Sequence, residues 1–193
     1  MKVRTVTEIP KDSMIPMVFE VLRIGQRLVR DDRVTTHVAL VARAFGASKI
    51  FMSEVNPEIK DTLDKINKNW GGNFSIDFIE SWKPILKKKK EDGFKILHLT
   101  MYGENINEIQ SKLKKENNLL IVVGAEKVPR EIYEYADYNV AIGSQPHSEI
   151  SGLAILLDRI QDGNQFDNIF SGAKKKIIPS KKGKNVIVNE TRD

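Results

Sequence analysis

Short apolar segments alternate with amphipathic segments along most of the chain. Apolar stretches at 17–24, 49–55, 74–79, 94–100, 119–123 and 138–142 predict strands, and Leu119–Val123 is apolar without interruption, as a strand covered on both faces should be. Apolar residues at three- and four-residue spacing predict helices from about Thr36, over 58–70, 82–90, 105–115 and 129–136, and from about Ile150. This alternation predicts an α/β fold: a mostly parallel sheet with helices on both faces.

The pattern changes near both ends of the chain. Residues 1–16 are polar and contain Pro10 and Pro16, which predicts an N-terminal extension. Residues 17–162 then form the α/β domain. Within 163–193, two short β-prone segments, 177–178 and 186–188, flank the sequence PSKKGKN, which predicts a basic C-terminal β-hairpin appended to that domain.

Composition narrows the class of protein. The 193 residues are 40% hydrophobic, no apolar run approaches the roughly 18–20 residues of a membrane span, and the start has no apolar signal region, so we expect a cytoplasmic protein without a membrane partner. The absence of cysteine excludes disulfides and thiolate metal sites, and the three scattered histidines do not have the spacing of metal ligands.

The net charge of +5 is modest, so the distribution of the basic residues matters more than their number. Lysines cluster at 87–90 and again within 174–184. Such clusters suit a phosphate backbone, and the alternative interpretation is a solvated surface.

Three glycine-containing loops follow predicted strands in the second half of the chain, at 99–103, 124–129 and 143–149. Ligands of open parallel sheets bind beyond the carboxyl ends of the strands, where a glycine allows close approach and a helix start offers free N–H groups. None of the loops has the GxxxxGK[ST] pattern, and no GxGxxG follows the first strand. This arrangement disfavours nicotinamide enzymes and the common Rossmann-like methyltransferases.

Long strings of residues carry a family resemblance. VLRIGQRLVRDDRVTTHVALVARAFGA, HLTMYG, IVVGAEKVPREIYEYADYNVAIG and QPHSEISGLAILLDR together resemble the archaeal tRNA (cytidine-56) 2′-O-methyltransferases, members of the SPOUT superfamily. The resemblance runs from about Val18 to at least Arg159. It implies a deep trefoil knot in the C-terminal half, S-adenosyl-L-methionine as cofactor, tRNA as substrate, 2′-O-methylation of a cytidine ribose, and a homodimer.

The same resemblance implies a cofactor site formed mainly by backbone groups of the three loops, with apolar Leu99 and Ile142 packing against the adenine. Carried over position by position, the cofactor contacts fall on Leu99, Gly124, Ala125, Glu126, Lys127, Val128, Ile142, Gly143, Ser144, Gln145, Pro146, His147, Ser148 and Glu149. We interpret His147 as a helix-start residue near the ligand and His98, inside an apolar strand, as structural.

The resemblance also implies that residues near the first helix act on the ribose 2′-hydroxyl, because related knotted enzymes use an arginine there. We expect Arg33 and His37 to contact the reacting groups, while Arg23 and Arg43 support RNA or the partner subunit. A neutral imidazole is a better base than a guanidinium, which stays protonated. In the alternatives, His37 packs beside the sheet, and Arg33 and Arg43 bind a phosphate bidentately.

Two other functions remain open from the sequence. One is a non-catalytic RNA-binding protein with the same fold, which would bind RNA without the cofactor. The other is a nucleotide-binding α/β oxidoreductase, which would bind a dinucleotide and would not bind S-adenosylhomocysteine.

Overall fold

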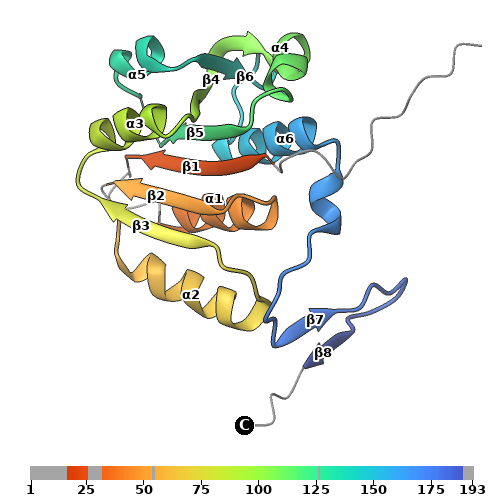
Figure 1. Ribbon diagram of the computed structural model, residues 1–193. Coiled ribbons are helices and arrows are strands. Elements are labelled where there is room, and N and C mark those ends of the chain that lie inside the picture. Colours follow the sequence, from red (N-terminus) through yellow and green to blue (C-terminus); the bar gives the residue numbers. More distant parts are fainter. Residues whose placement is uncertain (1–16, 26–31, 54, 126, 189–193) are drawn as a thin grey trace, which may run out of the picture.

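A computed structural model describes residues 17–25, 32–53, 55–125 and 127–188 (Figure 1). The predicted N-terminal extension, 1–16, lies outside them. The strands are β1 (Val18–Ile24), β2 (Lys49–Ser53), β3 (Ser75–Ile79), β4 (Lys95–Asn105), β5 (Asn118–Gly124), β6 (Tyr138–Ala141), β7 (Lys175–Ile177) and β8 (Val186–Val188). The helices are α1 (Asp32–Ala44), α2 (Glu58–Trp70), α3 (Trp82–Glu91), α4 (Ile106–Leu113), α5 (Arg130–Tyr135) and α6 (Glu149–Gln161), with a 3₁₀ turn at Asn164–Asp167. Within these ranges, none of the helices is long and apolar enough to cross a membrane.

One six-stranded sheet forms the centre of the structure (Figure 1). Its order is β3-β2-β1-β5-β4-β6, and every neighbouring pair is parallel. Helices α1, α2, α4 and α6 pack on one face, and α3 and α5 pack on the other. The predicted α/β fold with helices on both faces of a parallel sheet is therefore confirmed.

Burial follows the apolar pattern of the strands. All five residues of Leu119–Val123 in β5 are buried, because this strand lies between β1 and β4 and both of its faces are covered. In α2, Ile59 and Leu63 are buried, Ile66 is partly buried against the same core, and most of the other residues are polar or charged. A helix with one apolar stripe on the sheet face is what its sequence predicts.

Helix α1 begins at Asp32, four residues before the predicted start. The apolar spacing that predicts a helix marks only the buried face, whereas the first turn contains Asp32 and an exposed Arg33. Thr35 is consequently buried inside the helix and does not cap it.

The predicted loop at Met101–Gly103 is part of β4. Leu99 pairs with Val140 of β6, and after a register shift Glu104 pairs with the same Val140. The four residues between them are therefore an insertion in the pairing of the two strands. Met101 and Tyr102 are exposed, so this segment lacks the buried apolar residues that mark a strand in a sequence.

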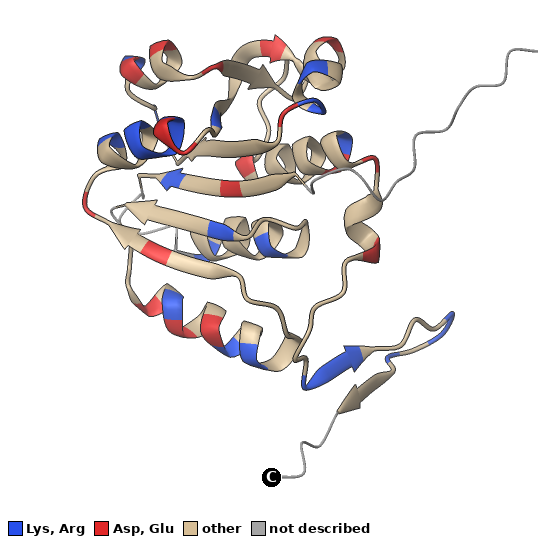
Figure 2. Cartoon of the chain, viewed as in Figure 1, with Lys and Arg blue, Asp and Glu red and all other residues tan. Residues whose placement is uncertain are grey.

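Strands β7 and β8 pair antiparallel, with Lys175 opposite Val188 and Ile177 opposite Val186. The pair lies apart from the six-stranded sheet, near the end of α2 (Figure 1). Basic residues, blue in Figure 2, lie in β7 and in the turn that follows it. These side chains are the lysines of 174–184.

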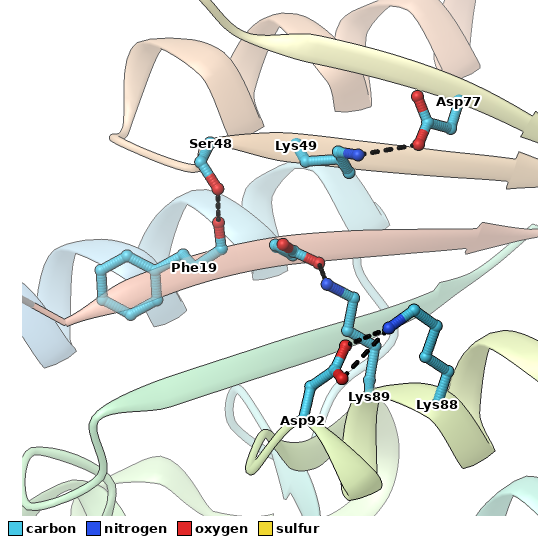
Figure 3. A network of polar contacts seen from close by, with 8 residues as sticks. Phe19, Ser48, Lys49, Asp77, Lys88, Lys89 and Asp92 are labelled. Carbon is cyan, nitrogen blue, oxygen red and sulfur yellow. Dashed lines mark hydrogen bonds and ion pairs between the residues drawn. The ribbon is translucent and has the colours of Figure 1, made fainter.

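The lysine run 87–90 lies on α3, and much of its charge is used within the subunit (Figure 3). Lys89 forms a nearly buried ion pair with Glu20 of β1, at 2.5 Å, and its ammonium lies 4.4 Å from the centre of the Phe94 ring. Lys88 bonds Asp92 on the same helix. A phosphate bound here would therefore have to replace Asp92 or Glu20 as the partner of these lysines.

Candidate binding site

A cavity of about 600 Å³ opens at the carboxyl edge of the sheet, where β5 and β6 end and where the pairing of β4 with β5 stops. Its position agrees with the rule that ligands of parallel sheets bind at this edge, and its volume is within the range of small-molecule sites. Its lining comes from the three predicted loops and from helix α5. The lining residues are His98, Leu99, Thr100, Met101, Tyr102, Gly124, Ala125, Lys127, Val128, Tyr133, Ile142, Pro146, His147 and Glu149.

Most of the residues carried over for the cofactor lie in this lining. Those that do are Leu99, Gly124, Ala125, Lys127, Val128, Ile142, Pro146, His147 and Glu149. Gly143, Ser144, Gln145 and Ser148 are exposed residues of the third loop and are not part of the lining, while Glu126 lies outside the described residues. From the sequence we did not predict His98, Thr100, Met101, Tyr102 or Tyr133 as binding residues. Four of them lie in HLTMYG, one of the strings that carry the family resemblance.

The third loop is fixed where it enters α6. The side chain of Ser148 caps the helix by accepting a hydrogen bond from the N–H of Ile150, at 3.2 Å. Gly152 leaves room for the loop, because a Cβ at this position would lie 3.0 Å from Cε1 of His147 and 3.3 Å from Cδ2 of Leu99. The close packing of loop, helix and β4 therefore holds two lining residues in place.

A polar cluster forms the floor of the cavity. His98 is 1% exposed, and its Nδ1 lies 2.9 Å from Oδ1 of Asn139 on β6. Tyr133 of α5 meets the His98 ring edge-on, with the ring centres 4.5 Å apart, and its hydroxyl bonds Thr100. Burial lowers the pKa of His98 below its ordinary value, against the smaller raising effect of the bond to Asn139. His98 is therefore neutral at pH 7.

Arg23 connects the first strand to the third loop. Its side chain is fully buried at the end of β1, and Nη2 bonds Oε1 of Glu149 at 3.1 Å, at the first residue of α6. The carboxylate is 28% exposed and also lines the cavity. The structure therefore gives Arg23, expected to support RNA or the partner subunit, a contact inside its own subunit that positions the pocket wall.

Glu149→Ala should lower the free energy of unfolding by about 2 kcal/mol, because it removes a charge-assisted hydrogen bond of the fully buried Arg23 side chain. Urea unfolding followed by circular dichroism measures the change. The matched control is Glu131→Ala, which breaks an ion pair with Lys83 in which both side chains are 61% exposed. The control should cost less than about 1 kcal/mol. Equal small losses in both variants would contradict a stabilising role for the Arg23–Glu149 pair.

Arg43 lies at the other end of α1, away from the cavity. Its Nε donates to Oδ1 of Asn67 at 2.8 Å, Nη2 donates to the carbonyl of Gly71, and the guanidinium lies 4.7 Å from the centre of the Phe170 ring. These contacts hold the end of α2 and the segment after α6 at the amino edge of the sheet. Within the subunit, Arg43 is therefore a structural residue far from the predicted chemistry.

Arg33 and His37 are exposed on the first two turns of α1 and are not part of the cavity lining. The chain leaves β1 at the edge that holds the cavity: the N–H of Ala125 donates to the carbonyl of Ile24 at 2.9 Å. Helix α1 therefore starts at the carboxyl edge of the sheet, which is also the edge where the cavity opens. The two side chains face solvent there, where a large substrate could reach them.

The described residues contain no group of three or more His, Cys, Asp or Glu side chains that could hold a metal ion. Within the described residues, the cavity instead offers backbone groups, apolar side chains, the neutral His98, the Glu149 carboxylate and the Lys127 ammonium. Such a mixture suits an uncharged or zwitterionic organic ligand of nucleoside size.

The chain is similar in sequence to proteins of a known family. A family model described as "tRNA ribose 2'-O-methyltransferase, aTrm56" matches residues 70–187. The tRNA (cytidine(56)-2'-O)-methyltransferase of Nitrosopumilus maritimus is 76% identical over 92% of this chain and 100% of its own length. The enzyme of the same name from Thermococcus kodakarensis is 53% identical over 86% of this chain and 95% of its own length.

Solved structures share the fold at low sequence identity. The match to the A. aeolicus TrmH/SpoU tRNA modifying enzyme covers 79% of this chain and 79% of that chain, with a TM-score of 0.54 and 17% identity. The SpoU methyltransferase AviRb from Streptomyces viridochromogenes, in complex with AdoMet, covers 80% of this chain and 63% of its own, with a TM-score of 0.54 and 13% identity. By its sequence relatives and its matching family model, the chain belongs to the aTrm56 family of tRNA ribose 2′-O-methyltransferases.

Proposed function

We propose that the protein transfers a methyl group from S-adenosyl-L-methionine to the ribose 2′-oxygen of cytidine 56 in tRNA. The observation that carries the proposal is the 76% identity to an enzyme of that name along its whole length. The cavity at the carboxyl edge of the sheet lies where the family resemblance predicts the cofactor.

The residues of the cavity fit the cofactor. A volume of about 600 Å³ accommodates a nucleoside with an amino-acid arm. Leu99, Val128 and Ile142 supply apolar contacts, and the segments at Gly124 and Pro146 bring main chain to the wall. When bound, S-adenosylmethionine supplies a methyl group already activated on a sulfonium.

The remaining task falls to the protein's own residues. The 2′-hydroxyl has a pKa far above neutrality, so its proton must be removed or its oxygen tightly oriented. His37 is the proposed base and Arg33 the proposed group that orients the ribose or its phosphate. Both lie near the start of α1 and face solvent, where an RNA can approach.

The finer features of the family are proposed as well. We propose that the chain forms a trefoil knot around the cavity, acts as a homodimer, and uses the 163–193 segment as a basic appendage to the 17–162 domain. The lysines of 174–184 are the proposed phosphate contacts, because they lie on a hairpin apart from the sheet (Figure 2). A cytoplasmic location accords with a tRNA substrate.

Incubation of unmodified tRNA with the protein and a labelled methyl donor should place the label on one ribose. Mapping by alkaline hydrolysis identifies it, because a 2′-O-methyl group blocks cleavage of the adjacent phosphodiester. The control transcript carries 2′-deoxycytidine at position 56 and should remain unlabelled. Label at another nucleotide, or on a base, would overturn the proposed reaction.

Ligand-induced melting shifts separate the alternatives, because a ligand that binds only the folded state raises its stability. S-adenosylhomocysteine at about 100 times its Kd should add about 2.7 kcal/mol. RNA binding without any shift by S-adenosylhomocysteine would indicate a non-catalytic RNA-binding protein. A shift by NADH in place of S-adenosylhomocysteine would indicate the oxidoreductase.

A further inference from the structure

The inference concerns His98 at the floor of the cavity and rests on the proposed cofactor. Four polar side chains meet there from three elements: His98 and Thr100 of β4, Tyr133 of α5 and Asn139 of β6. His98 and Asn139 are directly paired in the register of β4 and β6. Their contact is therefore fixed by the sheet itself.

The orientation of the Asn139 amide determines which ring nitrogen of His98 carries the proton. Nδ2 of Asn139 donates to the carbonyl of Tyr133 at 2.9 Å, a bond that only the amide nitrogen can make. Oδ1 must then be the atom that faces His98, and an amide oxygen only accepts hydrogen bonds. Nδ1 of His98 is consequently the donor, so in the neutral ring Nε2 has a free lone pair.

The second nitrogen opens onto the cavity. Among the described residues, no protein group bonds Nε2, and Nε2 is not one of the fully enclosed polar atoms that lack a partner. His98 is nonetheless part of the cavity lining. The small exposed part of this histidine therefore presents an acceptor to the ligand space.

We propose that His98 is a cofactor-recognition residue, held as its Nδ1–H tautomer by Asn139, whose Nε2 accepts a hydrogen bond from an N–H or O–H group of the bound cofactor. Cofactors of this class carry such donors on the adenine amine, the ribose and the amino-acid arm. Burial lowers the pKa of His98 and keeps the lone pair available at pH 7.

Two variants separate the ring nitrogens. His98→Asn keeps an amide N–H near the Nδ1 position and loses the Nε2 acceptor. His98→Gln places an amide oxygen near the Nε2 position and loses the donor to Asn139. In calorimetry, His98→Asn should bind S-adenosylhomocysteine roughly tenfold more weakly than wild type, and His98→Gln should lose no more than about threefold. The thermal midpoint should fall more in His98→Gln than in His98→Asn.

Gln165→Met is the matched control, because it removes a buried polar contact, the 2.7 Å bond to Asp158, away from the cavity. It should bind S-adenosylhomocysteine as wild type does. Equal affinity in His98→Asn and wild type would overturn the inference. Failure of wild type to bind S-adenosylhomocysteine would instead overturn the proposed function.

Nitrogen NMR of wild-type protein labelled at histidine tests the tautomer without any variant, and so tests this premise of the inference even if the variants do not fold. A protonated Nδ1 and an unprotonated Nε2 at pH 7 would support the inference, and the reverse would overturn it. A second ligand locates the donor: methylthioadenosine lacks the amino-acid arm. If His98→Asn weakens this ligand as much as S-adenosylhomocysteine, the donor is on the adenosine; if it weakens only S-adenosylhomocysteine, the donor is the ammonium.

Discussion

Gly103→Ala should destabilise the protein by about 3 kcal/mol or more, the upper part of the range for overpacked sites. A Cβ on Gly103 would lie 2.4 Å from both the carbonyl carbon and the oxygen of Asn139, and 2.5 Å from the nitrogen of Val140. These atoms are main chain and cannot move aside as a flexible side chain can. The strands β4 and β6 would have to separate, and both carry walls of the cavity.

Urea unfolding of Gly103→Ala measures the loss, and calorimetry with S-adenosylhomocysteine shows whether the cavity survives. Gly93→Ala is the control: its φ of +83° makes any side chain strained, yet nothing lies within 4 Å of its Cβ position. Left-handed strain alone costs about 1–2 kcal/mol. If Gly103→Ala lost no more than Gly93→Ala, the close approach of β4 to Asn139 would not limit the fold.

The same close approach explains what the sequence could not reveal about β4. The buried part of the strand has an apolar pattern and was predicted, whereas Thr100–Gly103 are an insertion held by β6, some 40 residues later in the chain. A local pattern cannot show a pairing that distant. Glycine at 103 appeared as a loop residue, although the structure requires it inside a strand, where it allows two backbones to meet.

The position of the candidate site could be predicted from the sequence, whereas several of its lining residues could not. The rule for parallel sheets and the three glycine loops predict a ligand at the edge of the sheet where the cavity lies. His98 was interpreted as structural, and it does bond Asn139, but it also lines the cavity. Tyr133 reaches the cavity from α5, on an element whose sequence gives no sign of a ligand. Such contacts arise from packing between elements and have no signature in spacing.

The roles of the basic residues were the hardest to predict from the sequence. Arg23, Arg43 and Lys89 look like RNA-binding cations in the sequence, yet each is buried or nearly buried and pairs within the subunit. A count of basic residues contains no information about which side of a strand or helix faces the core. The lysines of 174–184 are mostly exposed and remain available for phosphates.

Arg33→Ala and His37→Ala should each lower the methylation rate on tRNA, measured at saturating S-adenosylmethionine, by about 100-fold or more, the lower bound for loss of a positioned acid or base. Both side chains are exposed in the described subunit, so neither substitution should change the free energy of unfolding by more than about 0.5 kcal/mol. A kinetic loss without a stability loss would locate the defect in the reaction.

Two further variants separate the proposed roles. Arg33→Lys keeps a charge but not the bidentate geometry, so it should restore tRNA affinity more than turnover if the arginine orients the ribose. Lys112→Ala is the control for loss of an exposed cation, since Lys112 is exposed in the last turn of α4. Its turnover should equal that of wild type. Near-normal turnover in both Arg33→Ala and His37→Ala would remove these residues from the reaction, and the search for the base would move to other residues of the protein or to the RNA itself.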